Sequence, residues 1–162
     1  MADDDSALQA FRKKVQGTNI NEQTLLATDY LNHLNEPIML FEMLGDVPEL
    51  LDELAAWHPK SYVEHFADSS FTDKALAIEA YGVAPEIYRK PFDETVENAN
   101  RCIAAAIEAL SKLREAGRDD EIRTLAAEVS RMLLTLVDKA SSIIHGQVNR
   151  MGQTQIDAIM DK

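Results

Sequence analysis

Two stretches decide the fold: residues 91–117, PFDETVENANRCIAAAIEALSKLREAG, and residues 119–144, DDEIRTLAAEVSRMLLTLVDKASSII. Apolar side chains recur in steps of four and three along the first stretch and in a heptad pattern along the second, which is typical of two helices packed against each other. The apolar positions are Phe92, Val96, Ala99, Ile103, Ala106, Leu110, Leu113, Ile122, Leu125, Ala126, Val129, Leu133, Leu136, Ala140 and Ile143. Because only a short turn at Gly117 separates the two stretches, we expect an antiparallel αα-hairpin.

The rest of the chain also favours helices. We expect a short first helix that ends before Gly17, a second from Asn19 or Asn21 to Leu44, a third over 48–57, and three short pieces within 60–90. The hairpin would then begin at Pro91, a residue favoured at the start of a helix. The sequence therefore predicts an all-α protein: a helical bundle domain over 1–151 with a long C-terminal antiparallel αα-hairpin, followed by a short amphipathic C-terminal tail over 152–162.

Composition narrows the functional classes. The chain of 162 residues carries 28 acidic and 16 basic side chains, a net charge of −12, which disfavours nucleic acid as a partner. The acidic start has no basic signal-peptide region, no apolar run is long enough to cross a membrane, and one cysteine, Cys102, fits a reducing compartment. We expect a cytoplasmic protein without membrane contact and without a cofactor. The alanines of the hairpin seam make a homodimer a further possibility.

One polar stripe lies on the predicted second helix. Asp29, Asn32, His33 and Glu36 are spaced i, i+3, i+4 and i+7, and Pro37 follows them directly. Proline removes a backbone hydrogen bond and leaves the carbonyl of residue 33 free, which can shape a site beside the stripe. A solvated helix face has the same composition, so spacing alone does not separate a site from an ordinary surface.

The last ten residues, QTQIDAIMDK, resemble a short docking peptide. Flagellar switch proteins begin with, and CheZ-type chemotaxis phosphatases end with, a peptide of the form Ser-Gln-x-Glu-Ile-Asp-Ala-Leu-Leu that docks on the chemotaxis response regulator. Matching residues stand at Gln153, Ile156, Asp157 and Ala158, and conservative replacements of leucine at Ile159 and Met160. An amphipathic segment of this length suits binding of a helix in a groove. The resemblance implies a response-regulator partner, which would itself carry the Mg²⁺ of the phosphorylated site.

The same resemblance implies a catalytic pair. Chemotaxis phosphatases use an acid and an amide three or four helix positions apart, and Asp29 with Asn32 is similar to such a pair. Hydrolysis of an aspartyl phosphate needs a positioned water, which a carboxamide can orient, while the acid can pair with the partner's lysine. Asn32 would orient the water, and His33, Asn35 and Glu36 would line the site. Gln147 is a second candidate amide, although Ile143 stands where its acid should be.

Two alternatives remain at this point. Residues 32–38, NHLNEPI, are similar to the phosphoacceptor box of histidine kinases, although the register is imperfect and no ATP-binding domain follows. That similarity implies a histidine-phosphotransfer module with His33 as the acceptor. The other alternative is a non-catalytic helical adaptor or scaffold that assembles a signalling or flagellar complex. We expect a regulator-binding protein, with phosphatase activity as its more specific form.

Overall fold

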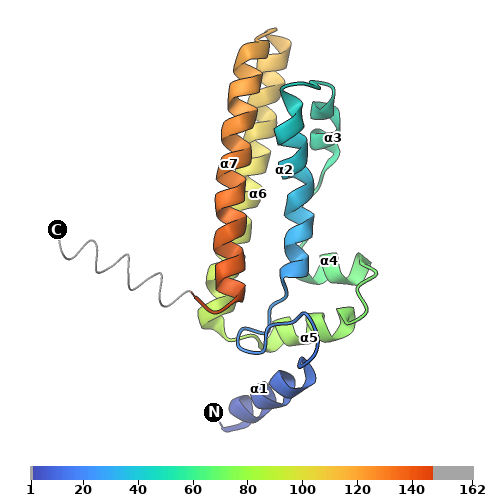
Figure 1. Cartoon of the computed structure of the whole chain (residues 1–162), viewed down its shortest axis with the longest axis vertical. Helices are drawn as coiled ribbons and strands as arrows, with labels where there is room; N and C mark the ends of the chain where they lie inside the picture. The colour runs from blue at the N-terminus through green and yellow to red at the C-terminus, as the bar shows by residue number, and fades with distance from the viewer. Residues whose placement is uncertain (1, 148–162) are drawn as a thin grey trace, which may run out of the picture.

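The computed structural model describes residues 2–147, and within them every regular element is helical. In order these are α1 (Ala2–Lys14), the 3₁₀ helix η1 (Thr28–Leu31), α2 (Asn32–Leu44), α3 (Leu50–Ala56), α4 (Tyr62–Asp68), α5 (Lys74–Val83), α6 (Glu86–Glu115) and α7 (Asp119–Ile144). The long helices α6 and α7 run side by side, α2 packs along α7, and α3 to α5 lie at their side and lower end (Figure 1). The all-α helical bundle is confirmed.

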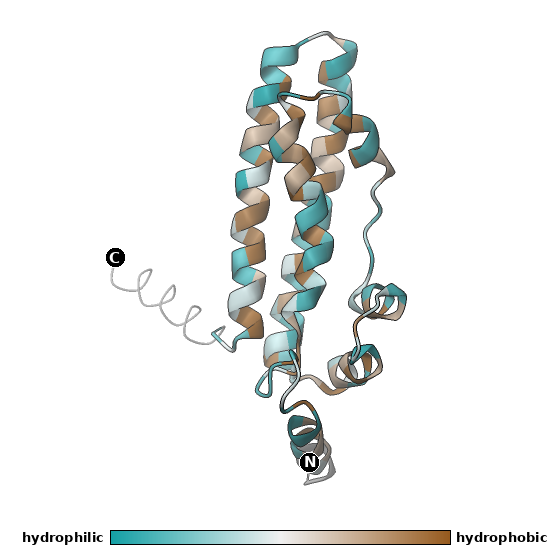
Figure 2. Cartoon of the chain, turned by 45° about the vertical axis from the view of Figure 1, so that its right-hand side comes forward, coloured by the Kyte–Doolittle hydropathy of each residue, from teal (hydrophilic) through white to brown (hydrophobic). Residues whose placement is uncertain are grey.

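The hairpin is the part of the bundle that the heptad pattern predicts best. Both seams are apolar and mostly buried. Brown segments recur along the long helices in Figure 2. At the turn, Gly117 adopts a φ of 69°, and the amides of Gly117 and Arg118 donate to the carbonyls of Arg114 and Leu113. This is a Schellman ending, which satisfies carbonyls at the end of a helix and turns the chain back sharply.

The predicted start of the hairpin is wrong by five residues. Helix α6 begins at Glu86, directly after Pro85, and Pro91 lies inside it. A proline beyond the first turn costs a helix about 3 kcal/mol, through one lost hydrogen bond and a clash with the carbonyl four residues earlier. Packing of the thirty-residue helix outweighs that cost. The hydroxyl of Thr95 donates to the Pro91 carbonyl at 2.7 Å and supports the same turn. Of the three short pieces expected within 60–90, the last is the beginning of α6, and the first two form α4 and α5.

The predicted second helix begins too early. Between α1 and η1 the chain forms turns and one isolated antiparallel bridge, from Ile20 to Ala27. The side chain of Asn21 caps a turn there, accepting from the amides of Gln23 and Thr24 at 2.8 and 3.0 Å. Residues 24–27 are all buried, which a single face of a helix cannot achieve, and Leu25 has a φ of 61°. Helix α2 therefore starts only at Asn32, continuing from η1.

None of the helices in the described part of the chain combines the length and apolar character needed to cross a membrane.

Two glycines give a matched test of the hairpin turn. Neither Gly117 nor Gly82 would bring an added Cβ within 4 Å of another residue, but only Gly117 has a positive φ. We expect Gly117→Ala to lower the free energy of unfolding by about 1–2 kcal/mol, because alanine is strained in the left-handed region. Gly82→Ala, inside α5, should raise it by about 0.5–1 kcal/mol. Urea unfolding followed by circular dichroism measures both, and equal effects would contradict the turn geometry.

Candidate functional site

The residues of the polar stripe differ in exposure, although all of them lie close to the start of α2. Asn32, Asn35 and Glu36 are exposed on the first two turns of the helix, as a surface site requires. Asp29 lies in η1 and is partly buried, and its Oδ2 has no hydrogen-bond partner among the described residues. His33 is also partly buried. Two members of the stripe, Asn32 and Glu36, therefore share a surface with Asn35, while Asp29 and His33 are partly buried.

His33 makes structural contacts with the segment that leads into α4. Its Nε2 accepts a hydrogen bond from the backbone amide of Lys60 at 3.0 Å, and its ring stacks on Trp57 with a centroid distance of 4.8 Å. Burial, with smaller contributions from His65 and Lys60, lowers the pKa of His33 from 6.5 to about 4. The ring is therefore neutral near pH 7 and holds α2 against this segment. Phosphorylation at Nε2 would require the loss of the bond to Lys60.

The His33 contact predicts a pH dependence of stability. Because the folded-state pKa of His33 lies below its ordinary value, the unfolded chain takes up the proton first. The contribution of His33 is complete above pH 6.5 and falls as the pH drops towards 4. A His33→Gln variant keeps an acceptor but does not titrate. We expect the difference in unfolding free energy between the natural chain and this variant to shrink by about 1 kcal/mol from pH 7 to pH 5, a value reduced for the ring's partial exposure. A constant difference would contradict the assignment.

Gln147, the second candidate amide, is exposed directly after α7. Its backbone amide donates to the carbonyl of Ser142 at 3.0 Å and completes the helix ending, while Ile143 is buried in the seam. No acid stands one turn before it. The candidate docking residues Gln153, Ile156, Asp157, Ala158, Ile159 and Met160 lie outside the described residues.

Sequence reasoning overlooked two further acid-and-amide pairs on α6. Glu94 and Asn98 are four positions apart and both exposed, and Glu97 and Asn100 are three positions apart. The signal was present, since the same spacing was the criterion applied to Asp29 and Asn32. The two amides differ in access: the Oδ1 of Asn100 is buried and has no hydrogen-bond partner among the described residues. Only the exposed Asn98 could enter the active site of a partner.

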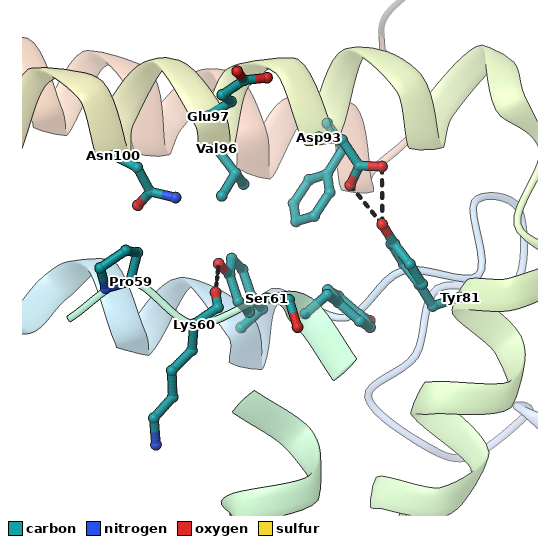
Figure 3. A pocket seen from close by; sticks show the side chains of 11 residues that line it. Pro59, Lys60, Ser61, Tyr81, Asp93, Val96, Glu97 and Asn100 are labelled. Atoms are coloured by element: carbon teal, nitrogen blue, oxygen red, sulfur yellow. Dashed lines mark hydrogen bonds between the residues drawn. The ribbon is translucent and has the colours of Figure 1, made fainter. Parts of the chain in front are cut away.

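A cleft of about 310 Å³ opens between α6 and the segment that leads into α4. Figure 3 shows Val96, Asp93 and Asn100 on the α6 side, facing Pro59, Lys60 and Ser61. Glu97 and four rings complete its lining; the rings are those of Tyr30, Tyr62, Tyr81 and Phe92. The sequence did not identify this cleft, because its walls come from segments that are distant in the chain.

Hydrogen bonds fix the polar groups of the cleft. The hydroxyl of Tyr81 donates to the Asp93 carboxylate, at 2.9 Å from Oδ1 and 2.8 Å from Oδ2, and the hydroxyl of Tyr30 donates to the Lys60 carbonyl at 2.6 Å. Burial raises the pKa of Asp93, while the hydrogen bond from Tyr81 and the charge of Arg89 act in the opposite direction. Burial and the bond to Asp93 raise the pKa of Tyr81 to about 12, so the tyrosine stays a donor.

No group of three histidine, cysteine or acidic side chains in residues 2–147 is placed to hold a metal ion. No protein-family model, curated protein or solved structure matches the chain.

Proposed function

We propose that this protein binds a phosphorylated response regulator of the chemotaxis type through residues 152–162 and promotes hydrolysis of its aspartyl phosphate. The observation that carries the proposal is the agreement of the last ten residues with a regulator-docking peptide, with identity at Gln153, Ile156, Asp157 and Ala158. Apolar anchors at Ile156, Ile159 and Met160 would enter a groove of the partner, and Asp157 would make the polar contact.

The described bundle is compatible with such a partner in two respects. Its surface is acidic, with a net charge of −12 for the chain, which suits a regulator that presents a lysine beside its phosphorylated aspartate. It also presents amide side chains on rigid helices, Asn32 on α2 and Asn98 on α6, both exposed. Helices hold a catalytic group more accurately than loops do.

In the proposed reaction, one amide side chain of this protein orients a water molecule in the partner's active site. A carboxamide accepts a hydrogen bond from the water through its oxygen and can donate to a phosphate oxygen through its nitrogen. Asn32 has exposed neighbours at Asn35 and Glu36, although the acid of its pair, Asp29, is partly buried. Asn98 has an exposed acid, Glu94, one turn before it. The two positions define two separate surfaces, and substitution tells them apart.

Loss of the water-orienting amide should slow turnover strongly. With the regulator phosphorylated from acetyl phosphate in the presence of Mg²⁺, we expect sub-stoichiometric amounts of the natural chain to accelerate phosphate release. Alanine at the correct position, Asn32→Ala or Asn98→Ala, should reduce this acceleration about 100-fold, because a misplaced water loses the in-line geometry. Gln16→Ala, an exposed amide outside both surfaces, is the matched control and should keep full activity.

The same assay decides between the functional classes. Tail-dependent binding without any acceleration would replace the phosphatase with a non-catalytic adaptor. Transfer of the label from the regulator to this chain, abolished in His33→Gln, would replace it with a phosphotransfer module. Acceleration that survives both Asn32→Ala and Asn98→Ala would contradict the amide assignment, and Gln147→Ala would then be examined.

A further inference from the structure

We propose that the cleft between α6 and the segment leading into α4 is a binding site for an organic cation, a protonated amine or a guanidinium group attached to an apolar body. The proposal concerns residues that take no part in regulator docking or in the proposed hydrolysis, so it stands independently of that function. It rests on the hydrogen-bonding capacity, the charges and the walls of the cleft.

On the α6 side, the cleft has more hydrogen-bond acceptors than donors to fill them. The Asp93 carboxylate receives the hydroxyl of Tyr81 and retains free lone pairs, since two carboxylate oxygens accept about four hydrogen bonds. The Oδ1 of Asn100 is buried without a donor, at the other end of the lining in Figure 3. A buried acceptor without a partner costs free energy, and a ligand that supplies N–H groups recovers it. An ammonium or guanidinium group supplies several.

The charges around the cleft also favour a cation. Lys60 lines the cleft through its backbone, while its ammonium group points away from α6 and pairs with Asp68 at 3.2 Å. The other two nearby cations are engaged at the edge: Arg101 pairs with Glu97, and Arg89 donates to the backbone carbonyls of Tyr81 and Gly82 and lies 3.8 Å from Glu86. The Asp93 carboxylate therefore has no direct ion-pair partner among the described residues. An anion in the cleft would be repelled by the Asp93 carboxylate, which lines it.

The aromatic walls define the body of the ligand. Tyr62 and Tyr81 stack with a centroid distance of 4.6 Å and an interplanar angle of 17°, and Phe92 meets Tyr62 edge-on at 5.9 Å. These rings offer an apolar surface beside Asp93, against which the apolar body of the ligand can pack. The guanidinium carbon of Arg89, which lies outside the cleft lining, is 5.8 Å from the Tyr81 ring centroid, so this ring already has one cation near it. The volume of about 310 Å³ is at the small end of ligand-binding clefts.

Titration of the ¹⁵N-labelled full chain with phenethylamine tests the proposal by NMR. We expect saturable shifts of the backbone amides of Lys60, Ser61, Asp93 and Asn100, and at least tenfold weaker binding of phenethyl alcohol, the neutral analogue. Asp93→Asn and Asn100→Ala should each weaken phenethylamine binding at least fivefold. Asp138→Asn, the same change of charge at an exposed position on α7 outside the cleft, should leave it unchanged.

The outcomes separate the alternatives. Equal binding of the amine and the alcohol would overturn the role of the cation, and absence of shifts at these amides would overturn the site. The thermal unfolding curves of Asp93→Asn and Asn100→Ala are compared with that of the natural chain. A loss of binding is attributed to the cleft only for a variant whose unfolding curve is unchanged. A second titration with an acetylated and amidated Gly-Lys-Gly or Gly-Arg-Gly peptide identifies the source of the cation. Binding of the peptides would support entry of a partner's basic side chain, and binding of the free amine alone would support a small metabolite.

Discussion

Replacing Phe92 with alanine is expected to lower the free energy of unfolding by about 3–5 kcal/mol, the range found for large aromatic side chains removed from a core. Phe92 is 1% exposed and meets Tyr30 and Tyr62 edge-on, each at a centroid distance of 5.9 Å. It therefore joins α6 to η1 and to α4 in a single aromatic cluster. Its removal leaves a cavity at the point where these three elements meet.

Urea unfolding at pH 7, followed by circular dichroism at 222 nm, measures the loss. Met132→Ala on α7 is the control, because Met132 is 56% exposed and its truncation should change the unfolding free energy by no more than about 0.5 kcal/mol. A cost below about 1 kcal/mol for Phe92→Ala would mean that the aromatic cluster is not packed as described. The cleft walls would then lose their support.

The hairpin could be predicted from sequence because its signal is periodic and local. Heptad positions such as Ile103 and Val129 are apolar for one reason, burial against the partner helix, and the glycine of the turn has a φ that other residues avoid. The first residues of α6 were missed because Pro91 looked like a helix start. A single lost hydrogen bond does not end a helix that is held by packing on both sides.

The start of α2 could not be predicted because the competing structure depends on distant contacts. Thr24 donates from its hydroxyl to the carbonyl of Ile144 at 2.6 Å, and the Ala27 amide donates to the hydroxyl of Tyr62 at 2.9 Å. These contacts, 120 and 35 residues away, replace the helical hydrogen bonds that residues 21–27 would otherwise make. Local propensity contains no information about them.

The candidate site was predicted in part. Spacing placed Asp29, Asn32, His33 and Glu36 in one stripe, and the structure exposes Asn32 and Glu36, with Asn35 beside them, but partly buries His33. Asp29 lies before α2, in the 3₁₀ helix η1, and is partly buried, so it is not exposed together with these three residues. The cleft at Asp93 forms only where α6 packs against the segment before α4, so no local sequence pattern predicts it.

Shortening the chain after Met151 is expected to weaken regulator binding at least 100-fold. Interface energy is concentrated in a few apolar anchors, and this truncation would remove Ile156, Ile159 and Met160 together. Ile156→Ala combined with Met160→Ala should reproduce most of the loss in the full-length chain. Gln155→Ala is the matched control, because glutamine at this position departs from the docking peptide and should contribute little.

The most direct measurement is a calorimetric titration of the chemotaxis response regulator into the full chain and into the chain truncated after Met151. Each titration is made with and without beryllofluoride as the phosphate mimic, in the presence of Mg²⁺. The proposed function predicts tighter binding of the activated regulator to the full chain and loss of that binding on truncation. Absence of binding in both states, or equal binding by the truncated chain, would contradict docking through the tail.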